Sequence, residues 1–210
     1  MGQLVDTSQG KSLSEQVRER ISSIPHRKRH VSNPREHYRD YLIWSHSITR
    51  ASIPLMECSY YTSLHIPSVI KEFYRSQIEE EKGHDENIIS DLESIGITRQ
   101  EVLSYKPSQQ VAEVVGSQYY WIFHFDPVIL LGYIAAVDSP PTTIETINEL
   151  QRLTGYPSIA FRTLRQHAGL DIKHSQTLNY VLDKAVLSDE QKKWIMENAY
   201  YTKDRLCLKC

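Results

Sequence analysis

Two histidines and one aspartate stand at helical spacing in the last third of the chain. His167, Asp171 and His174 follow one another at intervals of four and three residues. On an α-helix this spacing places the three side chains on one face. Two imidazoles and a carboxylate in such a column form part of a typical ligand set for a divalent metal ion. The same pattern also fits a structural stack of hydrogen-bonded side chains or a polar surface, so this segment alone leaves the alternatives open.

A second cluster combines acidic residues with a histidine. Glu80 and Glu81 precede His84 by four and three residues, so either carboxylate can share a helical face with the imidazole. The two registers differ little, and the sequence does not decide between the two glutamates. Three consecutive acids, residues 79–81, are most simply a solvated surface. One carboxylate and one histidine on this helix would nevertheless complement the helix that carries the two other histidines.

Two further acids could add a carboxylate. Asp138 ends the most apolar stretch of the chain, Pro127–Val137, shortly before Pro140 and Pro141. It either faces solvent at a helix break or completes the same site. Glu57 is a second candidate, and its alternative is a surface position in the first long helix.

The elements that must position these residues are predicted to be helices. Eight glycines and nine prolines in 210 residues are few, and they fall at expected helix boundaries. No segment alternates with the period of two that is typical of strands. We expect Pro54 to kink one helix and Pro140–Pro141 to interrupt another. The predicted helices cover 12–23, 34–62, 67–95, 99–104, 107–124, 127–153, 157–186 and 189–206. We therefore expect a polar and basic lead-in, 1–30, and a single helical-bundle domain, 31–210.

Composition excludes several classes of protein. Lysine and arginine number 24 against 26 acids, which is a formal charge of −2 and argues against a nucleic-acid partner. The longest apolar stretch is too short to span a membrane. Three cysteines are too few for a disulfide scaffold, and no secretory signal is visible. We therefore expect a cytoplasmic protein with no nucleic-acid or membrane partner.

Taken together, three motifs resemble those of the haem-oxygenase-like di-iron oxidases and oxygenases, whose fold is shared with thiaminase II and pyrroloquinoline-quinone synthase. The motifs are Glu80-Glu81-Lys82-Gly83-His84, Ala135–Pro140 and His167-x3-Asp171-x2-His174. The last is the most specific. The first is shorter than in many members, and the second has Asp where Glu is commoner. The resemblance covers about residues 35–185 and implies an all-α, haem-oxygenase-like bundle of about seven helices.

The resemblance also implies a function. It implies a non-haem di-iron enzyme that uses O2 to desaturate, cleave or N-oxygenate a small carboxylate-bearing metabolite, such as an amino acid or a fatty acid. Two Fe(II) ions per chain, the second bound more weakly, would leave a net positive charge that suits an anionic substrate. The exposed helix faces also leave room for a homodimer. The implied metal ligands are Glu80 or Glu81, His84, Asp138, His167, Asp171 and His174.

Two alternatives remain. A metal-independent hydrolase of the thiaminase type would need a nucleophilic cysteine near the start of the segment at 126–131, and none is present there. A non-catalytic helical-bundle binding protein would use the same histidines and aspartates for structural hydrogen bonds. The aromatic residues between Tyr119 and Phe125 either line a substrate pocket or pack in the core. The terminal Cys207-x2-Cys210 is either incidental or a redox or metal-sensing pair.

Overall fold

The structure is a computed structural model that describes residues 10–25, 31–62, 66–139 and 142–207, without the side chain of Asp171. Every regular element in these ranges is helical, which confirms the predicted all-α class. The basic segment at 26–30 and Cys210 lie outside the described residues. The α-helices are α1 (Leu13–Ser22), α2 (Pro34–Thr62), α3 (Ser68–Glu81), α4 (His84–Glu93), α5 (Arg99–Ser104), α6 (Gln109–His124), α7 (Leu130–Val137), α8 (Ile144–Thr154), α9 (Arg162–Lys184) and α10 (Asp189–Leu206), and two 3-10 helices, η1 (Pro127–Ile129) and η2 (Ser158–Phe161), precede α7 and α9.

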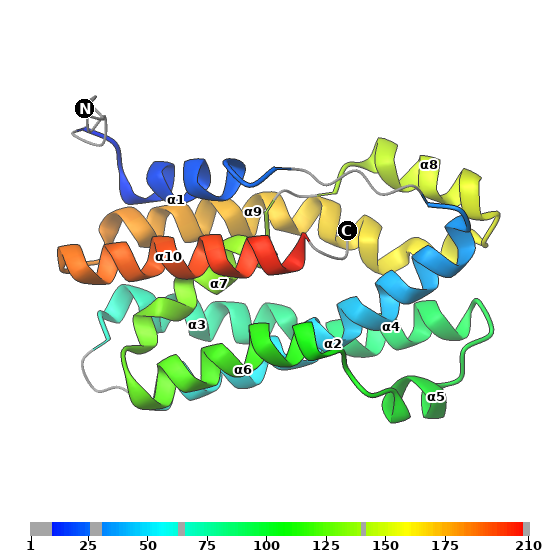
Figure 1. The fold of residues 1–210 in the computed structure, drawn as a ribbon, viewed down its shortest axis with the longest axis horizontal. Helices are drawn as coiled ribbons and strands as arrows, with labels where there is room; N and C mark the ends of the chain where they lie inside the picture. The colour runs from blue at the N-terminus through cyan, green and yellow to red at the C-terminus, as the bar shows by residue number, and fades with distance from the viewer. Residues whose placement is uncertain (1–9, 26–30, 63–65, 140–141, 208–210) are drawn as a thin grey trace, which may run out of the picture.

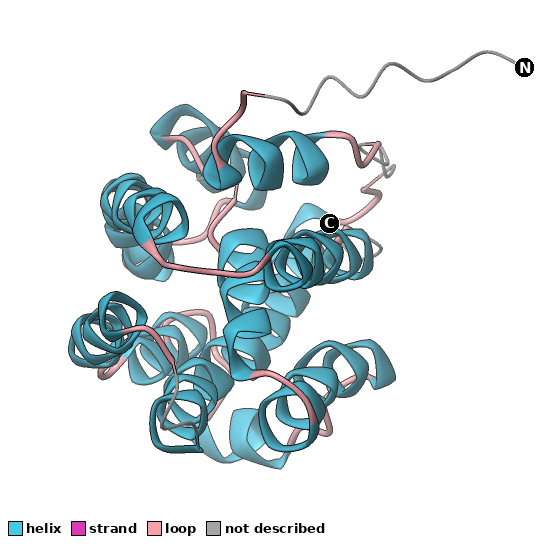
Figure 2. Ribbon diagram, turned by 90° about the vertical axis from the view of Figure 1, so that its left-hand side faces the viewer, coloured by secondary structure: helices cyan, strands magenta, loops and turns pink. Residues whose placement is uncertain are grey.

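The long helices form two layers with α7 between them (Figure 1). One layer contains α1, α9 and α10, and the other contains α2, α3 and α6 (Figures 1 and 2). Helix α7 packs mainly against α10, while α3 and α4 both contact α9. The two histidine-bearing regions of the sequence therefore meet where the layers face each other. None of the helices in the described ranges is long and apolar enough to cross a membrane.

Helix α1 belongs to the bundle. Its residues Leu13, Val17 and Ile21 are buried in the main hydrophobic cluster. The backbone amide and hydroxyl of Ser14 donate hydrogen bonds to the Asp183 carboxylate of α9, each at 2.9 Å. The predicted lead-in of residues 1–30 thus contains a packed helix. The domain begins at α1 rather than at residue 31, because the apolar face of this helix is covered by α9 and α10.

The predicted helix over 67–95 is two helices. Helix α3 ends at Glu81, and α4 begins at His84 after Gly83, whose φ is +82°. Glycine adopts this left-handed conformation without the steric penalty of a Cβ atom. The continuous-helix geometry that we expected between the two glutamates and His84 is therefore wrong, and His84 is the first residue of a new helix.

Two other predicted helices are also subdivided. The segment at 127–153 consists of η1, α7 and α8, with α7 ending at Val137 and α8 beginning at Ile144. This agrees with the expected interruption, although Pro140 and Pro141 themselves lie outside the described residues. The segment at 157–186 begins with η2 before α9.

Helices α6, α7 and α10 meet at a close-packed polar contact. Asn198 donates hydrogen bonds to the Gln118 side chain at 2.8 Å and to the Ile129 carbonyl at 2.9 Å. Gln118 donates back to Asn198 at 3.2 Å. At Gly132 of α7, an added Cβ would overlap the Ile195 carbonyl oxygen and lie 2.9 Å from the Ala199 amide nitrogen. This contact leaves no room for a ligand.

Candidate functional site

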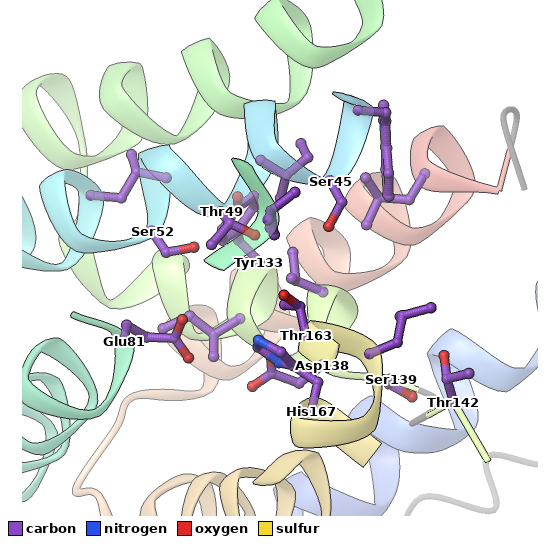
Figure 3. Close-up of a pocket in the computed structure, with 18 of the residues that line it drawn as sticks. Ser45, Thr49, Ser52, Glu81, Tyr133, Asp138, Ser139, Thr142, Thr163 and His167 are labelled. Carbon is purple, nitrogen blue, oxygen red and sulfur yellow. The ribbon is translucent and has the colours of Figure 1, made fainter. Parts of the chain in front are cut away.

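A cavity of about 370 Å³ lies between α2, α3, α7, α9 and α10. Glu81 of α3, His167 of α9 and Asp138 at the end of α7 all line it (Figure 3). Helix α2 contributes hydroxyl groups to the lining, and most of the remaining lining is apolar. The fold thus brings one residue from each of the three predicted motifs to a single cavity.

Glu81 is the centre of a buried cluster of charged and polar side chains. Its Oε2 lies 3.0 Å from Nδ1 of His84, and its Oε1 lies 3.8 Å from Nδ1 of His174. The side chains of His84 and His174 are 4% and 2% exposed, and that of Glu81 is 14% exposed. Because α3, α4 and α9 each supply one of these groups, the cluster depends on the packing of three helices.

Glu80 occupies the outer side of the same cluster. One carboxylate oxygen lies 3.0 Å from Nε2 of His174, and the other accepts a hydrogen bond from Lys173 at 2.9 Å. Its side chain is more exposed than that of Glu81 and does not line the cavity. The structure therefore separates the two glutamates that the sequence left equivalent: Glu81 faces the cavity, and Glu80 faces a surface lysine.

His167 completes a group of three imidazoles. Its ring centroid lies 4.8 Å from that of His84, with the two ring planes at 69°. The second ring nitrogen of His84 is 3.5 Å from the Gln166 side chain. His84 thus lies between Glu81 on one side and residues of α9 on the other. The first and third motifs of the sequence are in direct contact.

The remaining predicted ligands are less closely placed. Asp138 caps the end of α7, is half-buried and lines the cavity, so it lies at the same pocket as His167. Glu57 is exposed and does not line the cavity. The side chain of Asp171 lies outside the described residues, so its role stays a prediction. The described part of the site is accordingly Glu80, Glu81, His84, Asp138, His167 and His174.

The electrostatics favour ionised carboxylates in this cluster. Burial by itself raises the pKa of Glu81, but the hydrogen bond from His84 and the charges of the three histidines bring it below its usual value. The pKa of Glu80 is also lowered, first by the hydrogen bond from Lys173 and then by His174. Both carboxylates therefore remain anionic at neutral pH, which is the form that binds a metal ion.

The donor chemistry suits iron, although the side chains contact each other rather than surround a central point. Among the described residues, which omit the Asp171 carboxylate, no three His, Cys, Asp or Glu side chains form a ready-made metal-binding group. The Glu81–His84 and Glu80–His174 distances of 3.0 Å are those of hydrogen bonds. Buried imidazoles and carboxylates in mutual contact are still the donor types that bind iron in helical bundles. The residues present therefore fit this metal by type.

Sequence reasoning missed several residues of the cavity. Thr163 lies one turn before His167, so the same helical spacing could have indicated it. Tyr133, Lys203 and Cys207 also line the cavity, but they reach it only through tertiary packing. The aromatic segment around Tyr119–Phe125 does not contribute to the lining. Three of its rings, Tyr120, Phe123 and Phe125, are more than half exposed, so this segment neither lines the described cavity nor packs wholly in the core.

The chain was compared with known proteins in three ways. No family model matches it, and no curated protein sequence is significantly similar to it. Among solved structures, a domain of unknown function with a heme oxygenase-like fold from Shewanella denitrificans matches with a TM-score of 0.76 and 18% identity, over 94% of this chain and 86% of that one. A TenA homologue from Pseudomonas syringae matches with a TM-score of 0.67 and 10% identity, over 94% and 88% of the two chains. The chain therefore has the haem-oxygenase-like fold that its motifs predicted.

Proposed function

We propose that this protein is a non-haem di-iron oxidase or oxygenase that acts on a small carboxylate-bearing metabolite. The observation that carries the proposal is the contact of Glu81 with His84 and His174, with His167 beside them, at the edge of a cavity of about 370 Å³. A buried carboxylate among imidazoles is costly unless hydrogen bonds or a cation satisfy it, and clusters of this kind are typical of functional sites. The fold is one that includes enzymes, and the cavity gives a substrate access to the cluster.

The residues of the chain have separable roles in this proposal. Glu81, His84, His167 and His174 would hold the metal, with Asp138 and Asp171 as the remaining ligands. Bound Fe(II) would supply the activation of dioxygen. The apolar lining from α2 and α7 limits the water that reaches the reacting atoms. Lys203 donates a hydrogen bond to the Ser139 carbonyl and lines the cavity, so its positive charge lies where a substrate carboxylate could approach.

Iron loading under anaerobic conditions tests this function. We expect wild-type protein to bind up to two Fe(II) ions, the second more weakly, because the cluster is not ready-made for two ions. His167→Ala and His174→Ala should each lower the affinity about 10-fold or more. His124→Ala, at an exposed histidine of α6, is the matched control and should bind iron like wild type. On exposure to oxygen, the loaded protein should show a transient visible absorption band.

Three results decide this test. Faster decay of the band with a candidate amino acid or fatty acid would identify the substrate type. Absence of iron binding, or equal binding by the His167 and His174 variants, would contradict the proposal. Circular dichroism of each variant shows whether the fold is intact, so that loss of iron can be separated from loss of structure.

A thiol-dependent hydrolase is a second candidate. The specific observation that favours it is Cys207, which lines the cavity although the segment at 126–131 contains no cysteine. Cysteine is a nucleophile in its thiolate form. Activity that survives a chelator and is abolished by Cys207→Ser would support this alternative. Activity that depends on iron and survives the same substitution would support the oxidase.

A further inference from the structure

The side of the cavity formed by α2 carries three hydroxyl groups that the protein itself does not use. Ser45, Thr49 and Ser52 line the cavity and are half-buried, and their hydroxyls have no hydrogen-bond partner among the described residues (Figure 3). In contrast, Ser47 of the same helix donates to the Ile43 carbonyl, one turn back, at 3.0 Å. Serine and threonine hydroxyls in helices often bond in this way. The three cavity hydroxyls are therefore available to a ligand.

Gln77 of α3 adds an unpaired amide to the same cavity. The residue is only 4% exposed and lines the cavity, yet its amide makes no hydrogen bond within the described ranges. The unpaired polar atoms that the described structure encloses completely belong to other residues, so the free space of the cavity reaches this amide. A buried amide without a partner costs about 1–3 kcal/mol. The amide of Gln77 therefore needs a partner inside the cavity.

These neutral groups lie beside the proposed metal cluster. Gln77 stands one helical turn before Glu81 on α3, so the two side chains share a face, and both line the cavity. The α2 hydroxyls lie across the cavity from His167 (Figure 3). From Ser45 to Ser52 the row spans about 10 Å, at about 1.5 Å per residue. A ligand in contact with these groups would thus lie next to the cluster.

The chemistry of this side of the cavity favours one kind of substituent. Hydroxyls and amides are uncharged, and each can both donate and accept hydrogen bonds. A carboxylate only accepts, so it would leave the carbonyl oxygen of Gln77 unpaired, and an alkyl chain would leave every one of these groups unpaired. A primary amide presents a donor beside an acceptor and can form two reciprocal hydrogen bonds with Gln77. It is therefore the substituent that satisfies this side chain best.

We propose that Gln77 binds a primary amide group of the substrate, and that the hydroxyls of Ser45, Thr49 and Ser52 bind its remaining neutral polar groups. The substrate class is then a carboxylic acid that also carries a carboxamide, such as an amino acid with an amide side chain, and not a plain fatty acid. The inference rests on the proposed function in taking the ligand of this cavity to be the substrate.

Ligand binding can be measured without iron, so that this inference and the iron test fail separately. Adipamide is a neutral probe with a primary amide at each end, and octane-2,7-dione has methyl groups in place of its two NH2 groups. NMR titration should give a dissociation constant in the millimolar range for adipamide and wild-type protein. Gln77→Leu should weaken adipamide binding about 5–10-fold. The same substitution should change binding of the dione by less than about two-fold, because a ketone cannot form the reciprocal pair.

Thr49→Val and Ser47→Ala form a matched pair on α2. Loss of the Thr49 hydroxyl should weaken adipamide binding about 2–5-fold. Ser47 does not line the cavity and bonds to its own helix, so its substitution should leave binding within about two-fold of wild type. Thermal unfolding without probe gives a second readout. Because Gln77→Leu removes no hydrogen bond between described residues, it should not lower the midpoint of unfolding.

The outcomes are distinct. Loss of adipamide binding in Gln77→Leu that spares the dione, with Ser47→Ala like wild type, would support the inference. Any of four results would overturn it: no adipamide binding to wild type at about 20 mM probe, equal adipamide binding by wild type and both cavity variants, equal loss of both probes in Gln77→Leu, or failure of that variant to fold. The last result would mean that the amide supports helix packing instead of a ligand.

Discussion

Adjacent residues of α7 belong to two buried polar regions of opposite character. Gly132 faces the contact with α10, where Gln118 and Asn198 satisfy each other and no space remains. Tyr133 faces the cavity, where its hydroxyl has no partner among the described residues. The first region is close-packed and internally satisfied, which is typical of polar groups that hold helices together. The second is open and incompletely satisfied, which is typical of a binding site. Burial of a polar group alone therefore does not distinguish structure from function in this bundle, whereas the state of its hydrogen bonds does.

The largest expected effect on stability comes from a substitution in the close-packed region. Gly132→Ala would place a methyl group against the backbone of Ile195 and Ala199, so α7 and α10 must separate. We expect a loss of about 3 kcal/mol in the free energy of unfolding, measured by urea denaturation. Gly116→Ala is the control, because an added Cβ there meets no atom within 4 Å. Alanine should stabilise that helix by about 0.5–1 kcal/mol. Equal effects of the two substitutions would show that α7 and α10 are not closely packed.

The next largest effect on stability comes from a pair of substitutions, one in each of the two polar regions. Asn198→Ala removes the hydrogen bonds to Gln118 and to the Ile129 carbonyl and leaves both buried partners unpaired. We expect a loss of about 2–3 kcal/mol in the same denaturation experiment. Tyr133→Phe, which removes a hydroxyl that has no partner among the described residues, should change stability by less than about 0.5 kcal/mol. If the two losses were similar, the distinction between a satisfied and an unsatisfied region would not hold.

A third pair of variants tests the two glutamates. Glu81→Gln should reduce Fe(II) affinity about 10-fold or more, because Glu81 faces the cavity and contacts two histidines. Glu80→Gln should have a smaller effect, since Glu80 pairs with the exposed Lys173 outside the cavity. Anaerobic Fe(II) titration measures both. A larger effect of the Glu80 substitution would assign the metal to the outer side of the cluster.

The smallest expected effect concerns a buried histidine outside the cluster. Burial, and then the charge of Arg50, lowers the pKa of His46. The unfolded chain therefore binds a proton at a higher pH than the folded protein. Stability should be complete above about pH 6.5 and should fall as the pH drops toward the folded-state pKa, by at most about 1.4 kcal/mol per pH unit. His46→Gln should reduce this slope between about pH 7 and 5.5. An unchanged slope would assign the pH dependence to other groups.

Local signals in the sequence were sufficient for the helical class and for several helix ends. Ser188 and Thr98 begin capping boxes with Gln191 and Glu101, as residues of these types do at the starts of helices. The break at Gly83 was not predicted, because one glycine within a helix-like pattern is tolerated in many helices. Its backbone conformation depends on how α3 and α4 are packed against α9.

The candidate site was predictable only in part. The spacing of His167 and His174 placed both on one face of α9, and the structure brings that face to Glu81 and His84. The assignment of Glu81 to the cavity required the three-dimensional packing, since residues 80 and 81 precede His84 by four and three residues and either spacing allows a contact with it. Tyr133 and Cys207 carry no local pattern that points to the cavity. Long-range contacts between helices bring them there.

The break at Gly83 also changes the local field around Glu81. A continuous helix over this region would have its backbone amides paired within the helix. Because α4 instead starts at His84, the amides of its first turn have no carbonyl partner within α4, and the positive end of its macrodipole lies beside Glu81. Glu81 is also the last residue of α3, so the negative end of that helix lies at the same turn and opposes the field of α4. Against the burial that raises its pKa, the Glu81 carboxylate is therefore kept charged mainly by the hydrogen bond from His84, which the turn makes possible.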